Sequence, residues 1–324
     1  MNYISSTSTV SLSDYSFLGM RTYCRFPAGP GAFFKAHVDT PRSEAMFGSL
    51  VIVLPTSHEG GSLLFKHGGK EWSFESAKTA SMSSNPQAAF VAFFSDVEHE
   101  VSLVIDGYRV TLTYNLYFDE SKSLPVVVSP GSRADEEAKM ALMRLLDDPG
   151  FLPDGGLLGF GLTHKYALST TTDLSDLESK LKATDAAFKR LCTALSLPTS
   201  LKVAYQDDLY DEYDYCLGDE FLDLEHSGEC EDGIAGELIE RNIGILIMDV
   251  EKTTTRHLHT QTFRGSKLKP KPIAWAKPIV QMTNAVKTSY VTYGNEASLN
   301  SGYGDLCLVA EVPSASHRKA KRSQ

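Results

Sequence analysis

The sequence predicts a mainly β protein, in which an N-terminal jelly-roll domain is followed by an α+β C-terminal domain. Residues 20–118 contain eight short, strand-like runs with turn residues between them. Beyond residue 118 the pattern changes, and segments with the apolar spacing of helices alternate with strand-like runs. Eight short antiparallel strands indicate a jelly roll or a barrel, because doubling or closing a sheet protects its edges.

The strand-like runs are separated by residues that favour turns. Pro55 ends the third run, and two glycines, Gly60 and Gly61, lie where the fourth begins. Asp106 and Gly107 separate the last two runs, and Asp-Gly between two apolar runs is a signal of a two-residue hairpin. We therefore expect the last two runs to pair directly. The eight runs span residues 21–26, 32–39, 47–55, 61–67, 70–74, 88–94, 99–105 and 108–118.

The C-terminal half combines predicted helices with predicted strands. Residues 133–148 and 171–197 have the apolar spacing of helices, and the first of these segments opens with acidic residues. The predicted organisation is a jelly-roll domain over residues 1–120, a linker over 121–132, an α+β domain over 133–313 and a basic, disordered tail over 314–324.

The composition limits the class of protein. The chain has 324 residues and is 42% hydrophobic, so it can bury a sizeable core. No apolar run reaches the roughly 20 residues that span a bilayer, and the N-terminus lacks the pattern of a signal peptide. The five cysteines include no Cys-x-x-Cys pair, which argues against a disulfide framework and against a zinc knuckle. We expect a reducing compartment, cytoplasmic or nuclear, and no membrane partner.

The net charge of −10 is unevenly distributed. Residues 207–232 hold 12 acidic residues and no Lys or Arg, whereas residues 252–277 hold seven basic residues and no acidic ones. The acidic segment has two interpretations: a solvated acidic loop, or a docking surface for a basic partner. The overall negative charge, without a basic stripe interleaved with aromatic residues, argues against a nucleic-acid partner.

The most informative short stretch is FFKAHVDT, residues 33–40. In a strand, residues i and i+2 project from the same face, so His37 and Asp39 would lie side by side. A single His-x-Asp triplet is common by chance. A second imidazole, His99, opens the seventh run. Two histidines and one carboxylate form the facial triad of non-haem Fe(II) oxygenases, which leaves coordination positions open.

A buried cation is expected near this triad. Arg109 follows Asp106-Gly107, so the predicted hairpin would place it on the strand next to His99, and Thr111 shares its face. Burying an arginine is costly unless an anion compensates for it. The planar guanidinium can bind a carboxylate through two hydrogen bonds. We therefore expect Arg109, assisted by Thr111, to bind the far carboxylate of 2-oxoglutarate, whose 2-oxo acid group would occupy two of the open positions on the metal.

Several motifs together resemble a known family. They are H-x-D-T at 37–40, LVIVLP followed by EGG at 50–61, D-x-x-H-E-V at 96–101 and G-Y-R-x-T-L-T-Y-N-L at 107–116. Over residues 20–118 the chain resembles the iron(II)/2-oxoglutarate dioxygenases of the prolyl 4-hydroxylase type, and within them a group common in fungi. The resemblance implies a double-stranded β-helix (jelly-roll/cupin-like) fold, with Fe(II) held by His37, Asp39 and His99.

The resemblance also implies a cofactor set and a reaction. Fe(II) and the cosubstrate 2-oxoglutarate are expected, with a role for ascorbate left open. The expected activity is hydroxylation of a C–H bond, on a prolyl residue of a protein, with succinate and CO2 as co-products. Two alternatives stay open: an oxygenase acting on a small molecule, and a catalytically weakened jelly-roll module that binds partners or serves as a scaffold.

Overall fold

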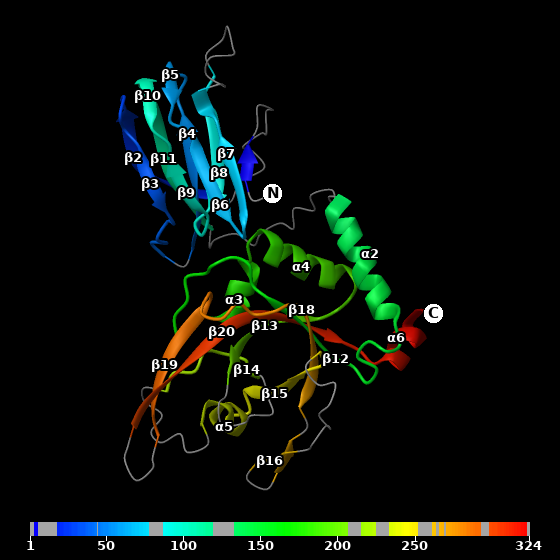
Figure 1. Cartoon of the computed structure of the whole chain (residues 1–324). Helices are drawn as coiled ribbons and strands as arrows, with labels where there is room; N and C mark the ends of the chain where they lie inside the picture. The colour runs from blue at the N-terminus through cyan, green and yellow to red at the C-terminus, as the bar shows by residue number, and fades with distance from the viewer. Residues whose placement is uncertain are drawn as a thin grey trace. The chain divides into compact units, whose positions relative to one another are not determined.

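The protein is described by a computed structural model (Figure 1), whose chain divides into two units, Met1–Val126 and Val127–Gln324. Each unit is considered by itself. The division falls near the predicted linker, residues 121–132, which lies outside the described residues. Among the helices in the described part of the chain, none combines the length and the apolar character needed to cross a membrane. The described residues are 3–5, 18–43, 45–77, 87–118, 133–206, 215–224, 233–251, 261–263, 266–268, 270–292 and 298–322.

Unit 1 consists of antiparallel strands in two main sheets, which confirms the predicted jelly roll. One sheet has five strands in the order β1-β8-β4-β11-β2, and the other has four in the order β3-β9-β6-β7. Strands β5 and β10 form a separate pair. The strands are β1 Tyr3–Ser5, β2 Leu18–Ala28, β3 Phe34–His37, β4 Met46–Val53, β5 His58–Gly60, β6 Leu63–His67, β7 Lys70–Phe74, β8 Ala89–Phe94, β9 Glu98–Val101, β10 Val104–Gly107 and β11 Arg109–Phe118.

The core of unit 1 lies between the two main sheets. Strand β8 alternates buried and half-buried positions along its whole length, as a strand with one inward face does. Burying each apolar side chain here contributes about 1.5–3 kcal/mol. The inward residues are Val51 and Val53 of β4, Val91 and Phe93 of β8, Leu63 and Phe65 of β6, and Val97 in the turn before β9.

The predicted hairpin at Asp106-Gly107 is wrong. These residues belong to β10, which pairs with β5, whereas β11 pairs with β2 and β4. Gly107 has a φ of +72°, and a Cβ at this position would lie 2.2 Å from the Ser57 carbonyl oxygen. Gly107 is therefore needed because the backbone at this position passes close to Ser57, just before β5. The chain then continues into β11 of the five-stranded sheet. The local hairpin signal was overruled by pairing with a distant segment.

Unit 2 contains a closed sheet with helices packed against it. Its strands run in the order β12-β18-β15-β14-β13-β20, and β20 pairs back with β12, so the ring of hydrogen bonds closes, with β19 added beside β20. The strands are β12 Gly156–Gly161, β13 Thr199–Tyr205, β14 Tyr215–Gly218, β15 Gly244–Asp249, β18 Lys271–Lys277, β19 Ala285–Thr292 and β20 Ser298–Val312, besides the short pair β16 Gln261–Phe263 and β17 Ser266–Leu268.

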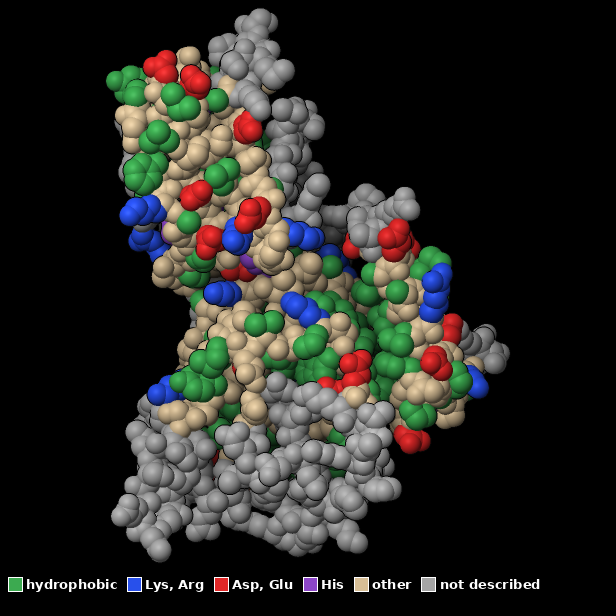
Figure 2. Space-filling view, viewed as in Figure 1, with side chains coloured by type: hydrophobic (Ala, Val, Ile, Leu, Met, Phe, Trp, Pro, Cys, Tyr) green, Lys and Arg blue, Asp and Glu red, His purple; other side chains and the backbone are tan. Residues whose placement is uncertain are grey.

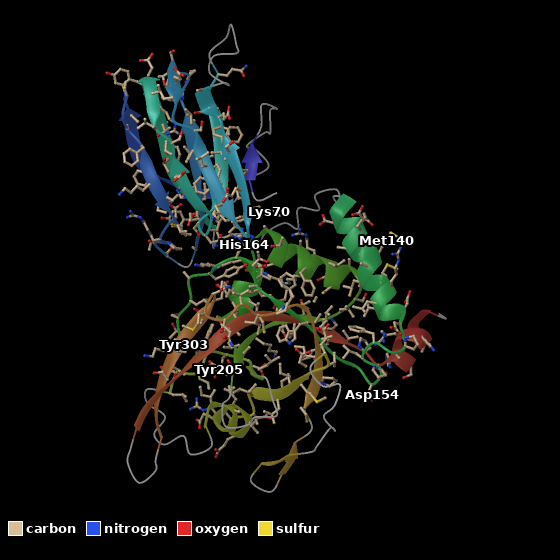
Figure 3. The ribbon with its side chains drawn as sticks, viewed as in Figure 1. Lys70, Met140, Asp154, His164, Tyr205 and Tyr303 are labelled. Atoms are coloured by element: carbon tan, nitrogen blue, oxygen red, sulfur yellow. The ribbon has the colours of Figure 1, made fainter. Side chains whose placement is uncertain are left out.

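The closed sheet has an apolar core on each of its two sides. One core takes residues from all six strands of the ring: Leu157, Ala204, Leu217, Ile247, Ile273, Cys307 and Val309. The other is covered by helices, and Tyr205, labelled in Figure 3, belongs to it. The helices of this unit are α2 Arg133–Asp147, α3 Leu174–Ser179, α4 Ala183–Ala194, α5 Gly233–Glu240 and α6 Ala315–Arg322.

The predicted helix over residues 171–197 is two helices, α3 and α4. Asp173 caps the first, since its side chain accepts hydrogen bonds from the backbone N–H groups of Ser175 and Asp176. Between the helices Lys182 is extended, its backbone N–H donates to the Tyr166 hydroxyl, and its Nζ donates to a backbone carbonyl. These tertiary contacts interrupt a segment whose apolar spacing is continuous.

Part of the acidic segment 207–232 contributes to the core of unit 2. Its central part forms β14, inside the closed sheet, and is followed by the buried Phe221, Leu222 and Leu224. Asp219, which lies just after β14, forms an ion pair with Lys202 of β13. The interpretation of one continuous solvated loop is therefore wrong for residues 215–224. Residues 207–214 and 225–232 lie outside the described part of the chain.

The predicted disordered tail is also wrong for residues 315–322, which form α6. The Arg318 side chain explains the order. Its guanidinium donates hydrogen bonds to five backbone carbonyls, four of which lie at the end of α2 and in the loop after it. The last carbonyls of a helix have no partner within the helix, so an arginine placed here satisfies them. The carbonyls belong to Leu146, Asp148, Phe151, Leu152 and Pro313.

We expect Arg318→Ala to lower the free energy of unfolding by about 1–3 kcal/mol, because hydrogen bonds from a charged donor are lost. Arg318→Lys should lose most of the same stability, since an ammonium cannot reproduce the fork of the guanidinium. Chemical denaturation followed by circular dichroism gives the energies, and hydrogen exchange should rise in residues 145–153. Full stability of Arg318→Lys would show that only the charge matters.

Candidate metal centre

The structure brings His37, Asp39 and His99 together. One ligand atom from each lies within 4.8 Å of the others, which is close enough for the three to hold one metal ion. His37 ends β3 and His99 lies on β9, and the two residues are direct partners in the antiparallel pairing of these strands. Asp39 follows β3, which ends two residues before it. The grouping expected from the sequence is present, although Asp39 lies beyond the strand.

Both imidazoles are oriented by a bond to the backbone. His37 Nδ1 lies 2.9 Å from the Lys35 carbonyl oxygen, and His99 Nδ1 lies 3.0 Å from that of Val97. A carbonyl can only accept a hydrogen bond, so each neutral ring carries its proton on Nδ1. The lone pair of each Nε2 then remains for a metal ion. Such partners behind the ligands are the usual means of fixing a metal-binding histidine.

The carboxylate of Asp39 is held from the opposite sheet. Ser49 Oγ, on β4, donates a 2.6 Å hydrogen bond to Asp39 Oδ2. The other oxygen, Oδ1, lies 3.9 Å from His99 Nε2. The two carboxylate oxygens therefore have different surroundings, and Oδ1 is the one that faces the ring nitrogen.

The charge state of His99 suits metal binding. Burial lowers the pKa of His99 below its usual value, which outweighs the raising effects of the Val97 carbonyl and of the Asp39 charge; the nearby His37 lowers it further. His99 is only 8% exposed. A lowered pKa means a neutral ring at neutral pH, and the neutral ring is the form that binds metals.

Aromatic rings pack against His99 on the buried side of the three candidate ligands. The Phe93 ring lies 4.5 Å from the His99 ring, centre to centre, and the Phe65 ring lies 5.1 Å from that of Phe93. Phe65 is the pairing partner of His99 on β6, whereas Phe93 comes from β8 of the other sheet. Residues of both sheets thus fix the His99 ring. On the open side, the Phe34 ring lies 4.5 Å from that of His37 and is 53% exposed.

Arg109 is a buried cation on β11. It is 5% exposed, and its Nε and Nη2 have no hydrogen-bond partner among the residues that the structure describes. Burial lowers its pKa to about 10, so it remains a cation at neutral pH. A Cβ on Gly61 would lie 2.8 Å from Arg109 Cδ, so this glycine makes room for the side chain. Thr111, 4% exposed, comes two residues later on β11, as expected for the same face.

Two contributors were missed by the sequence reasoning, namely Ser49 and Gly61. Each had a signal. Ser49 alternates with Val51 and Val53 in an apolar run, so it occupies an inward position where a hydroxyl needs a partner. The Gly60-Gly61 pair was interpreted only as a turn, but a glycine can also be required where a side chain from elsewhere passes close to the backbone.

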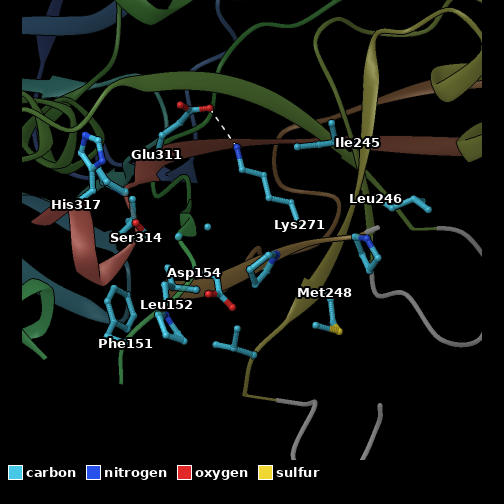
Figure 4. A pocket seen from close by; sticks show the side chains of 18 of the residues that line it. Phe151, Leu152, Asp154, Ile245, Leu246, Met248, Lys271, Glu311, Ser314 and His317 are labelled. Carbon is cyan, nitrogen blue, oxygen red and sulfur yellow. Dashed lines mark hydrogen bonds and ion pairs between the residues drawn. The ribbon is translucent and has the colours of Figure 1, made fainter. Parts of the chain in front are cut away.

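Unit 2 has a large pocket of a different character (Figure 4). It measures about 1240 Å³, and its rim includes segments 150–156, 270–272 and 311–314. Two charged residues that line it, Lys271 and Glu311, already pair with each other at 3.2 Å. None of the predicted site residues lines this pocket.

Comparisons with known proteins agree with this geometry. Residues 19–117 match the family model described as the 2OG-Fe(II) oxygenase superfamily, and the match lies within unit 1. It supports an oxygenase that uses Fe(II) and 2-oxoglutarate, with His37, Asp39 and His99 as the candidate metal site. No curated protein is similar enough to match.

Two solved structures are similar to part of the chain. One is an oxidoreductase of the 2OG-Fe(II) oxygenase family from Burkholderia pseudomallei, with 17% identity, a TM-score of 0.25, and coverage of 31% of this chain and 46% of that one. The other is a Pseudomonas putida prolyl-4-hydroxylase, with 24% identity, a TM-score of 0.25, and coverage of 32% and 54%. The matched part thus spans about half the length of each of these proteins.

We expect Asp39→Ala to weaken Fe(II) binding by about 100-fold or more, since loss of even an outer-shell partner typically costs 10–100-fold. Anaerobic isothermal titration calorimetry measures the affinity. The matched control is His58→Ala. His58 is a half-buried histidine of the same unit, bonded to Thr56 and Ser76 outside the cluster, and its loss should leave the affinity unchanged. Wild-type affinity in Asp39→Ala would exclude this carboxylate as a ligand.

Proposed function

We propose that unit 1 is a dioxygenase that uses Fe(II) and 2-oxoglutarate to hydroxylate a C–H bond. His37, Asp39 and His99 would hold the metal, and Arg109 with Thr111 would bind 2-oxoglutarate. The observation that carries the proposal is the cluster of three ligand atoms within 4.8 Å, in a segment that matches the 2OG-Fe(II) oxygenase model. The donor set suits Fe(II), because two imidazoles and one carboxylate leave positions open for other ligands.

The buried guanidinium is the second support for the proposal. An arginine that is 5% exposed and has buried nitrogen atoms without described partners needs an anion to offset its desolvation. 2-Oxoglutarate carries a carboxylate at each end, so one end can meet Arg109 while the 2-oxo acid end faces the metal ligands. A carboxylate bound by an arginine fork gains two charge-assisted hydrogen bonds. Thr111 would add a hydroxyl donor to the same carboxylate.

The residues of the chain bind and orient the reactants. Fe(II) together with 2-oxoglutarate supplies the oxidising chemistry in which O2 converts R–H to R–OH, with succinate and CO2 as co-products. The backbone bonds of His37 and His99 hold each Nε2 toward the metal position. Phe65 and Phe93 pack on the buried side and keep water away from it.

The substrate part of the proposal is a prolyl residue of a protein. It rests on the similarity of the motifs to the prolyl 4-hydroxylase type and its fungal group, and such similarity speaks to chemistry more than to substrate. On the face of unit 1 shown in Figure 2, acidic and basic side chains lie among one another, so the described residues of unit 1 form no continuous basic surface there. A cytoplasmic or nuclear location and a role for ascorbate as a reductant belong to the same proposal.

Release of succinate tests the reaction. The full chain, loaded with Fe(II) and supplied with 2-oxoglutarate and O2, should form succinate slowly even without substrate, and His99→Ala should not. No succinate from a folded, iron-loaded sample would favour a binding or scaffold module. Proline-containing peptides should then gain the mass of one oxygen atom. Faster succinate release with small molecules, but with no tested peptide, would retain the oxygenase and exclude the prolyl substrate.

We expect Gly61→Ala to weaken 2-oxoglutarate binding about tenfold, as the loss of a charge-assisted hydrogen bond would. The new Cβ would displace Arg109, because it would lie 2.8 Å from Cδ. Gly68→Ala is the matched control: Gly68 also has a positive φ, +55°, but nothing lies within 4 Å of its Cβ position. Both variants should lose about 1 kcal/mol of stability. Titration of 2-oxoglutarate into Co(II)-loaded protein measures the affinity, and equal affinities in the two variants would contradict the proposed role of Arg109.

A further inference from the structure

Ser49 provides an inward-facing hydroxyl in an otherwise apolar part of unit 1. It is 3% exposed and lies on β4, which β8 and β11 flank on both sides. Its direct partners across the sheet are Phe93 on β8 and Asn115 on β11. A side chain at the centre of three paired strands has little freedom to move. The position of the Ser49 hydroxyl is therefore set by the five-stranded sheet.

The hydroxyl distinguishes the two oxygens of Asp39. Oδ2 accepts the 2.6 Å hydrogen bond from Ser49 Oγ, and Oδ1 lies 3.9 Å from His99 Nε2. A short bond between a hydroxyl and a carboxylate is charge-assisted and strong. Carboxylates can bind a metal through one oxygen or through both. With Oδ2 engaged by Ser49, Oδ1 is the oxygen that would remain for a metal ion.

We propose that Ser49 is a positioning residue that makes Asp39 a one-oxygen ligand. The inference rests on the function proposed above. A facial triad is useful to an oxygenase because it leaves positions for the cosubstrate and O2. If both oxygens of Asp39 bound the metal, one of these positions would be lost. Loss of the Ser49 hydroxyl should therefore lower the affinity for 2-oxoglutarate more than the affinity for the metal.

The test separates these two effects with Co(II) as the metal probe. Ser49→Ala removes the hydroxyl, Ser49→Thr keeps it, and Ser76→Ala is the matched control. Ser76 is also buried, 1% exposed, but its hydroxyl lies 3.3 Å from His58 Nε2, outside the metal centre. Calorimetry gives the affinity for Co(II) and then that of the loaded protein for 2-oxoglutarate. The visible absorption spectrum of Co(II) reports its coordination.

In Ser49→Ala we expect the affinity for 2-oxoglutarate to fall about tenfold, because a coordination position that the cosubstrate needs is lost; this corresponds to about 1.4 kcal/mol of binding free energy. Co(II) affinity should change much less, and the Co(II) spectrum should differ from that of the wild type. Ser49→Thr and Ser76→Ala should behave as the wild type in all three measurements. Should the extra methyl group of threonine prevent folding, Ser49→Cys replaces it: a thiol of similar size but weak donor strength should behave as alanine does.

Two results would overturn the inference. One is an unchanged spectrum and an unchanged 2-oxoglutarate affinity in Ser49→Ala. The other is a loss of Co(II) affinity while the loaded fraction binds 2-oxoglutarate normally, because Ser49 would then strengthen metal binding without controlling the number of ligand oxygens. Failure of the wild type to bind 2-oxoglutarate would instead reject the proposed function, and the Co(II) spectrum alone would then decide the role of Ser49.

Discussion

The candidate metal centre depends on the pairing of β3 with β9. This pairing places His37 directly opposite His99, and it is irregular between Phe34 and His37. Successive side chains of a strand point to opposite faces, so a slip of one residue would turn an imidazole away from the site. Strand β6 holds β9 from its other side, with Phe65 opposite His99. The chemistry therefore depends on a register that extends across three strands.

Two buried groups of unit 1, His99 and Arg109, would have opposite electrostatic requirements in the proposed site. Metal binding needs His99 neutral, and burial favours that form. The proposed site needs Arg109 charged. Burial lowers the pKa of Arg109, but only to about 10, so the guanidinium stays charged at neutral pH. Burial thus favours the form of His99 that binds metals and leaves the Arg109 guanidinium in need of an anion. Natural proteins accept such local costs mainly at functional sites.

The sequence could predict the strands of the jelly roll, because strand alternation is a local property. It could predict the grouping of His37, Asp39 and His99 only from the ligand set of the facial triad, since the β3–β9 pairing that brings them together is not local. The β5–β10 pairing could not be predicted in this way. Asp106-Gly107 gives a strong local hairpin signal, but a contact between Gly107 and Ser57 decides the outcome. The role of Ser49 likewise depends on two sheets facing each other. The order of α6 comes from the carbonyls that surround Arg318, which no periodicity reveals.

The closure of unit 2 by its last strand affects how the chain can fold during synthesis. Strand β20 completes the ring by pairing with β12 on one side and β13 on the other, and α6 follows it directly. The ring therefore cannot close until β20, the last described strand, has been synthesised. All described strands of unit 1, in contrast, end by Phe118 and emerge early. Because domains generally fold as they emerge, unit 1 can be complete while unit 2 still exposes unpaired strand edges. Chains with such exposed edges are prone to aggregate, and chaperones act on them.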